Sequence, residues 1–329
     1  MLILVGVTVN VALNGGLFES ANKAAKQTQK EADREILQAA VIAALNEQLK
    51  IENANAILKN LPDGWDVTGP DGGPYICTSP KGNIFIVDVN GEITEPPNLP
   101  KGLVEGKEFP MDADQDGTDE TWIVLYKTAN EIEVISKNTM GNLALGATDE
   151  EAIKNATDID GSKTVEPLEK AIYSYNNAID RINNYCKDLI KIGNLGVRSV
   201  GSKPSDPSYK NTNPYAIEHL DEWSDQNAWT TYGVLGEGAD SNYNEDYTKM
   251  NTLGIKTSGD TKEYWLASRY VNEIWRDSSS YGFVYFDVWF VGDDGRLGGD
   301  LLWNVNSNGD TWADRPAYAV RPVVKLPYK

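Results

Sequence analysis

The chain has 329 residues, of which 40% are hydrophobic and 24% charged, and this composition excludes a disordered or collagen-like chain. Its 49 acidic and 30 basic residues give a net charge of −19, which disfavours nucleic-acid binding because it repels phosphates. The single histidine, His219, excludes multi-histidine metal sites. Two cysteines, Cys77 and Cys186, are too few for four-cysteine zinc sites or iron–sulfur clusters.

The first thirteen residues, MLILVGVTVNVAL, are almost wholly apolar and carry no charge. A membrane-spanning helix needs about twenty such residues, and a secretory signal begins with basic residues, so the segment fits neither. Two alternatives remain, which are a buried N-terminal helix or strand and a surface for association with other chains.

A long helix is expected from Leu17 to about Leu58, because alanine and isoleucine recur at spacings of three and four between charged residues. Some forty residues at 1.5 Å each would give a rod of about 60 Å. The helix should end at Asn60-Leu61-Pro62-Asp63-Gly64, a cluster of helix-breaking residues.

This order of an apolar tip, a Gly15-Gly16 joint and a long helix resembles the N-terminal stalk of type IV pilins, especially the pilin-like proteins of clostridia and related bacteria. The match covers about 45 residues and is carried by the run Leu2–Asn10, by Gly16-Leu17-Phe18, and by Ala21 and Ala24. Val5 stands where the family has a glutamate. The resemblance implies that copies of the chain pack together through Leu2, Leu4, Val5, Val7, Val9, Val11, Leu13, Leu17 and Phe18.

Strands are expected after Trp65. The run Asn83–Val89 precedes Asn90-Gly91, which is a strong hairpin signal, and Ile93 begins the returning strand. A second hairpin is expected from Thr121–Tyr126 and Glu131–Ile135. These strands predict an antiparallel sheet packed against the long helix, as in a pilin head.

An acidic loop lies between the two predicted hairpins. Asp112, Asp114 and Asp116 alternate before Gly117, which is the ligand spacing of a calcium loop, with the Thr118 carbonyl at position seven and Glu120 at position nine. Ile123 replaces the glutamate that an EF-hand needs at position twelve, so a compact calcium loop between strands is expected. The alternative is a solvated acidic turn.

Helices are also expected over 149–155 and 165–192. Cys186 lies near the end of the second of these, and Cys77 lies in a strand-like run, so the two thiols could form a disulfide or remain free and buried. Asn155 begins a triplet that fits a glycosylation site, a weak signal.

The C-terminal part is rich in aromatic residues, asparagine and glycine. Short strands are expected at Tyr264–Arg269, Gly282–Val288 and Tyr318–Val324, and their order resembles a bacterial surface domain related to C-type-lectin-like folds. Trp265 and Arg321 are expected to hold this fold together, with Arg321 paired to a buried carboxylate.

The sequence thus predicts an α+β protein with a long N-terminal helix packed on an antiparallel sheet and a loop-rich, lectin-like C-terminal domain. The expected segments are the tip and helix at 1–60, the sheet head at 61–160, and a helix with a display domain at 161–329. The expected function is a non-catalytic subunit of an extracellular type IV pilus-like filament, a homopolymer with structural Ca²⁺. The alternatives are an N-terminally anchored adhesin that binds carbohydrates or surfaces, and a secreted hydrolase.

Overall fold

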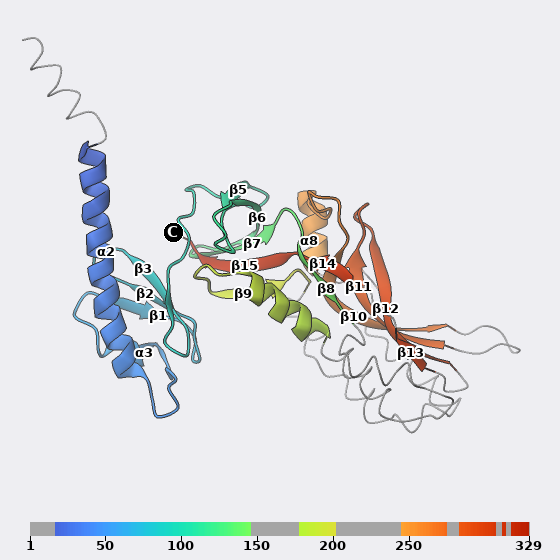
Figure 1. The fold of residues 1–329 in the computed structure, drawn as a ribbon, viewed down its shortest axis with the longest axis horizontal. Coiled ribbons are helices and arrows are strands. Elements are labelled where there is room, and N and C mark those ends of the chain that lie inside the picture. Colours follow the sequence, from blue (N-terminus) through green and yellow to red (C-terminus); the bar gives the residue numbers. More distant parts are fainter. Residues whose placement is uncertain are drawn as a thin grey trace, which may run out of the picture. The chain divides into compact units, whose positions relative to one another are not determined.

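The computed structural model describes residues 17–145, 178–201, 245–274, 283–306, 311–313 and 317–328. The chain divides into two compact units (Figure 1). Unit 1 comprises Met1–Pro97 with Gly193–Leu195, and unit 2 comprises Asn98–Ile192 with Gly196–Lys329.

The described part of unit 1 contains one long helix and a four-stranded antiparallel sheet of order β1-β2-β3-β4. Its elements are α2 (Leu17–Ala44), α3 (Ala54–Leu58), β1 (Asp66–Thr68), β2 (Tyr75–Thr78), β3 (Ile84–Val87) and β4 (Ile93–Thr94). Val87 pairs with Ile93, which confirms the hairpin predicted at Asn90-Gly91. Gly91 is needed there because its φ is +85° and a Cβ atom would lie 3.0 Å from Val41 Cγ1.

The C-terminal half of α2 supplies one side of the core of unit 1. Leu37 and Val41 are buried against side chains of α3, β2 and β3, including Ile57 and Phe85. The helix residues from Ser20 to Gln29 are exposed. Only the second half of α2 is therefore packed within the described part of unit 1.

The predicted helix from Leu17 to Leu58 is wrong in length, because α2 ends at Ala44 and α3 is a separate element. The reason is local. The Asn46 side chain accepts hydrogen bonds from the backbone N–H groups of Gln48 and Lys50, each at 3.0 Å, and Leu49 adopts a positive φ of 55°. Such side-chain bonds compete with helical ones. Asn53 then caps the start of α3 by accepting a bond from the Ala56 N–H.

Unit 2 contains a five-stranded antiparallel sheet of order β5-β6-β7-β15-β9. The strands are β5 (Glu108–Met111), β6 (Glu120–Lys127), β7 (Glu131–Ser136), β15 (Pro322–Pro327) and β9 (Gly196–Ser199). The β6–β7 pairing confirms the second predicted hairpin. Both faces of the sheet are covered, since Trp122 and Val124 enter one buried cluster while Ile123 and Leu125 enter another.

A second sheet of unit 2 has six strands in the order β13-β12-β11-β10-β14-β8. They are β13 (Thr311–Ala313), β12 (Leu297–Asn306), β11 (Phe283–Val291), β10 (Tyr264–Ile274), β14 (Ala317–Val320) and β8 (Met140–Ala144). The β10–β14 pair is parallel, and the other pairs are antiparallel. Unit 2 also contains a helix over 178–189 and α8 (Glu245–Leu253).

The predicted architecture is also wrong in the way it groups the strands. The chain is α+β with mostly antiparallel sheets, but within unit 1 α2 packs on α3 and on the sheet that contains β2 and β3, and the strands expected to complete that head, β5–β7, belong to unit 2. There β7 pairs with β15 near the C-terminus, and β8 pairs with β14. The C-terminal part is also built on long strands, of which β10 has eleven residues. These pairings join residues far apart in sequence, and no local pattern reveals them.

Trp265 and Arg321 are fully buried in unit 2, which confirms their expected structural role. Trp265 Nε1 donates to the Leu143 carbonyl at 2.8 Å. The prediction that Arg321 pairs with a buried carboxylate is wrong for the described residues. Its guanidinium donates instead to the carbonyls of Ser136 and Ile255 and to the Tyr264 hydroxyl, at 2.9–3.2 Å.

Candidate metal site

The acidic loop connects two neighbouring strands of unit 2. β5 and β6 pair in antiparallel register with Met111 opposite Glu120, so residues 112–119 form the connection between them. Met111 and Trp122 are buried in the core at the two sides of this connection. The loop therefore projects from strand ends whose side chains are held in place.

Four carboxylates converge in this loop. One oxygen from each of Asp112, Asp114, Asp116 and Glu120 lies within 4.8 Å of the others, and the described residues contain no second group of this kind. Carboxylate charges this close together repel one another unless a bound cation or a proton compensates them. The four acidic side chains that the sequence spacing predicted as ligands are therefore close together in the structure.

Backbone N–H groups hold these carboxylates in place. Gly117 donates to Asp112 Oδ2 at 3.1 Å, Thr118 donates to Asp116 Oδ1 at 2.7 Å, and Asp116 donates to Asp114 Oδ1 at 3.1 Å. Gln115 and Gly117 have φ values of 60° and 93°, which turn the chain around the carboxylates. The loop is therefore an ordered arrangement in which each aspartate is fixed by a main-chain donor.

Asp112 Oδ1 is the atom that most clearly fits a cation. It is buried and has no hydrogen-bond partner among the described residues, while Oδ2 of the same group accepts from Gly117. Leaving a buried charged oxygen without a partner is costly, on the order of 1–3 kcal/mol or more. A bound metal ion would remove that cost because it would contact the oxygen directly.

Glu120 sits at the start of β6, at the inner side of the loop. Its Oε2 accepts hydrogen bonds from the Ala113 N–H at 2.9 Å and from Trp122 Nε1 at 3.4 Å. Burial raises the pKa of Glu120; the two hydrogen bonds oppose this shift, the Asp114 charge adds to it, and the net pKa lies above its ordinary value. A cation in the loop would favour the charged carboxylate.

The arrangement can hold a metal ion. All of the side-chain donors are carboxylate oxygens, which suit hard cations, and the group lacks the histidine or cysteine nitrogen and sulfur ligands that zinc prefers. The predicted role of the Thr118 carbonyl stays a prediction.

The remaining predicted site residues are placed only in part. Asn155, His219 and the assembly residues from Leu2 to Leu13 lie outside the described residues, while Leu17 and Phe18 lie in the first turn of α2. Their proposed roles in association and glycosylation stay predictions.

Cys77 and Cys186 are both free, fully buried thiols. Cys77 lies on β2 in the core of unit 1, and Cys186 lies in the helix over 178–189 of unit 2. Burial raises the pKa of each thiol to about 12. A disulfide between them would require both buried positions to open.

One buried ionic cluster was missed by sequence reasoning. Arg198 contacts Asp246 and also donates to Glu133 Oε2 at 2.6 Å, while the Tyr126 hydroxyl donates to Asp246 Oδ1 at 2.9 Å. Burial lowers the pKa of Arg198, but the charges and hydrogen bonds of Asp246 and Glu133 outweigh burial, and the net pKa lies above its ordinary value. The four residues come from β6, β7, β9 and α8, so no local spacing could have indicated them.

Comparisons with known proteins give no relatives. No protein-family model matches the chain, no curated protein is significantly similar to it, and no solved structure matches its fold. Among the described helices, none combines the length and the apolar character required to cross a membrane.

Proposed function

We propose that this chain is a structural, non-catalytic subunit of an extracellular type IV pilus-like filament, in which copies associate through the apolar N-terminal segment and α2. The pilin-like sequence of the first 45 residues supports this proposal. The observation that carries it, however, is that α2 has a second apolar face, apart from the face that packs on the sheet.

The two faces of α2 point in different directions around the helix axis. Leu37, Val41 and Ala44 are buried against the sheet of unit 1. Ala25, Ala32, Ile36, Ala39 and Ala43, spaced by seven, four, three and four residues, share another face and are all exposed. We call these five residues the alanine face. The exposed fraction of Ile36, at 40%, is large for an apolar side chain.

The alanine face suits contact with another helix. Small side chains let two helix backbones approach closely, and Ile36 offers one larger apolar side chain to bury. The face runs along α2 in line with Phe18 and Ala21, one turn apart near the start of the helix. In a filament the alanine face of one copy would meet a different surface of the next copy, because only such heterologous contacts repeat without closing.

Calcium is the metal proposed for the acidic loop. Aspartates at positions one, three and five, a glycine at six and an acidic residue at nine form the oxygen-rich pattern that Ca²⁺ occupies in extracellular loops. The unpartnered Asp112 Oδ1 and the converging carboxylates support this choice. In this proposal the ion fixes the β5–β6 connection and takes no part in a reaction.

The filament proposal is tested by observing the purified full-length chain. Negative-stain electron microscopy and sedimentation at increasing protein concentration should show filaments of uniform width above a critical concentration. Antibodies against the chain should label filaments on the surface of cells that express it. A chain that stays monomeric at every concentration and lies inside the cell would contradict the proposal.

A further inference from the structure

Three lysines form a group on the N-terminal half of α2. Lys23, Lys26 and Lys30 share one face of the helix, and no acidic residue occurs between Ser20 and Lys30. Together with Asn22, Gln27 and Asn83 they line a surface hollow of about 460 Å³. Lys23 and Lys26 are exposed, while Lys30 is half-buried and contacts Glu95. We call the three lysines the lysine face.

Acidic residues gather at the other end of the helix. Glu47 follows the end of α2, and Asp88 and Glu92 flank the β3–β4 turn, in which Gly91 packs against Val41. Glu52 is close to the same turn, because the neighbouring Ile51 N–H donates to the Val89 carbonyl at 2.8 Å. We call Glu47, Glu52, Asp88 and Glu92 the acidic end; Lys50 is the basic residue among them.

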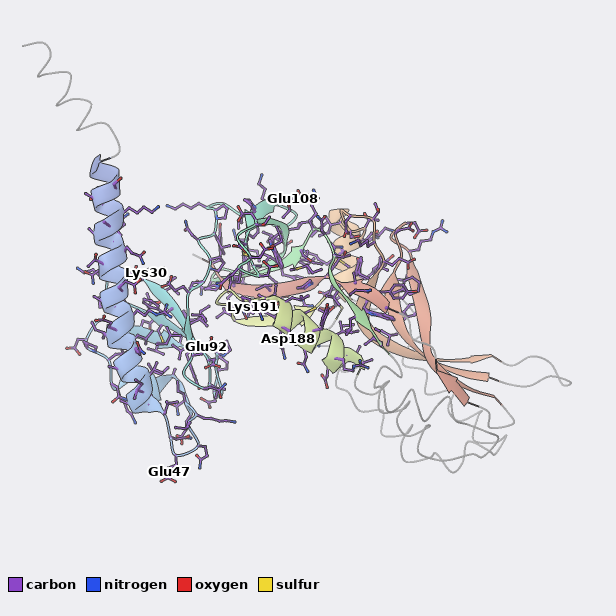
Figure 2. All side chains as sticks on the ribbon, viewed as in Figure 1. Lys30, Glu47, Glu92, Glu108, Asp188 and Lys191 are labelled. Carbon is purple, nitrogen blue, oxygen red and sulfur yellow. The ribbon has the colours of Figure 1, made fainter. Side chains whose placement is uncertain are left out.

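Lys23 and Lys26 are well separated from Glu47 within unit 1. Figure 2 shows Lys30 partway along α2 and Glu47 beyond the C-terminal end of the helix. Lys26 and Val41 are fifteen residues apart, which corresponds to about 22 Å along the helix axis. Lys23 and Lys26 are therefore too far from Glu47 and from the β3–β4 turn of their own chain to contact them, whereas Lys30 pairs with Glu95 of the same unit.

We infer that the lysine face of one copy binds the acidic end of a second copy. The inference rests on the proposed filament function and names the surfaces that would meet in it. A basic hollow is unusual on a chain with a net charge of −19, and another copy supplies carboxylates near the C-terminal end of α2 in the same unit. In a filament these carboxylates would be present at high effective concentration.

The pairing would also set the direction of assembly. Copies with a net charge of −19 repel one another in most orientations, so attraction between the lysine face of one copy and the acidic end of the next favours one orientation. Because the two surfaces differ, the contact is head-to-tail and can repeat without closing. Neighbouring copies would be displaced by about 20–30 Å along α2, since that is the separation of the two surfaces.

A charge-reversal series on the full-length chain tests the inference. One variant carries Lys23→Glu and Lys26→Glu, a second carries Glu47→Lys and Glu92→Lys, and a third carries all four changes. The matched control reverses two exposed lysines of unit 2, Lys101→Glu and Lys107→Glu, and so has the same net charge as the first variant. The critical concentration for assembly is measured by pelleting at about 50 mM and 500 mM salt, and circular dichroism checks folding.

Each double reversal within unit 1 should raise the critical concentration at least tenfold at low salt, because like charges then face one another. The fourfold variant should return to within about threefold of the wild type, since the attraction is restored with the signs exchanged. The control should resemble the wild type. High salt should weaken wild-type assembly, because the Debye length falls to about 4 Å.

Three outcomes would overturn the inference. If both double variants assemble like the wild type, this contact is absent although the filament function stands. If the wild type does not assemble at all, the inference and the proposed function fail together. If the lysine variant assembles normally but no longer binds an anionic polymer such as heparin, the lysine face binds a polyanion and not a second copy.

Discussion

The carboxylate of Asp246 accepts a hydrogen bond from the backbone N–H of Gly201 at 2.7 Å. Gly201 lies two residues after the end of β9, and Asp246 lies in the first turn of α8, so this bond connects the described residues that precede and follow 202–244. The same carboxylate is fully buried and contacts Arg198 and Tyr126. Asp246 therefore connects β6, β9 and α8 at one point.

Replacing Asp246 with alanine should reduce the free energy of unfolding by about 3–5 kcal/mol, because it leaves Arg198 with a buried, incompletely compensated charge. Chemical denaturation measures this change. Glu133→Ala is the matched control, since Glu133 contacts the same guanidinium but its side chain is 23% exposed, and its loss should cost clearly less. Equal costs for the two variants would contradict a special role for Asp246.

Local turn chemistry explains which parts of the fold could be predicted. The Asn90-Gly91 hairpin and the β6–β7 hairpin follow from neighbouring residues, and so does the acidic loop, in which Asp112, Asp114 and Asp116 alternate before a glycine. The early end of α2 depends on Asn46 bonding its own backbone, an alternative to the helix that periodicity does not weigh. The spacing of the apolar residues in α2 also did not show which of them pack on the sheet and which remain exposed.

Contacts between residues far apart in the sequence account for the parts of the fold that could not be predicted. Val323 of β15 pairs with Ile135 of β7, almost two hundred residues earlier, and the sequence offers no sign of that partnership. For the same reason the partners of Arg321 were predicted wrongly. A buried arginine suggests a carboxylate, but carbonyls of Ser136 and Ile255 and a tyrosine hydroxyl meet its donors.

The two thiols should be unreactive in the native protein. Burial raises the pKa of Cys77 and of Cys186 from 9.0 to about 12, so at pH 8 the thiolate fraction falls about a thousandfold even before access is considered. Ellman's reagent should therefore detect no thiol in the native chain and two in denaturant without reductant. Cys77→Ser should lower the second number to one. No thiol in denaturant, restored by reductant, would establish the disulfide instead.

Asp33 should make the stability of unit 1 fall at low pH. Burial raises its pKa, but hydrogen bonds from Ser79, Asn83 and Gln29 and the charge of Lys81 outweigh burial, and the net pKa lies below the ordinary value of 3.8. A lowered pKa means that the stabilisation is present above pH 3.8 and is lost as the pH falls through the folded-state value.

The Asp33→Asn variant should accordingly be less stable than the wild type at pH 7, by about 1–2 kcal/mol, with a difference that shrinks at pH 3. Thermal unfolding followed by circular dichroism at several pH values measures this. Glu35→Gln, on an exposed face of the same helix, is the matched control and should be as stable as the wild type at pH 7. A difference between Asp33→Asn and the wild type that is constant with pH would show that the carboxylate charge is unimportant.

Removing calcium should destabilise the β5–β6 connection. In the presence of a chelator, four converging carboxylates repel one another, so the melting temperature should fall and proteolysis between Pro110 and Trp122 should increase. Asp114→Ala should abolish this response to calcium. Asp119→Ala is the matched control, because Asp119 is an exposed loop carboxylate outside the cluster. A native chain that responds to neither calcium nor chelator would show that the loop is only an acidic turn.

Protons should compete with calcium at Glu120, whose pKa is raised mainly by burial. Calcium affinity measured by calorimetry should therefore weaken as the pH falls toward the raised pKa, and Glu120→Gln should show weaker binding with less dependence on pH. The Glu120→Asp variant keeps the charge but shortens the reach to the cluster. It should retain the pH dependence at a lower affinity, which separates the effect of charge from that of geometry.

The alanine face of α2 can be tested without disturbing the core, because two isoleucines on the same helix differ in the direction they face. Ile36 lies on the alanine face, whereas Ile42 lies about a quarter turn away and is more exposed, at 64% against 40%. Ile36→Glu should place a charge where two helices would meet and raise the critical concentration for assembly at least tenfold, equivalent to about 1.4 kcal/mol. Ile42→Glu introduces the same charge on the same helix and should change it much less. Both variants should melt like the wild type, since neither side chain belongs to the buried core of unit 1.

Pelleting assays and negative-stain images of the two variants provide the comparison. Equal assembly by both would exclude the alanine face as the surface through which the helices associate.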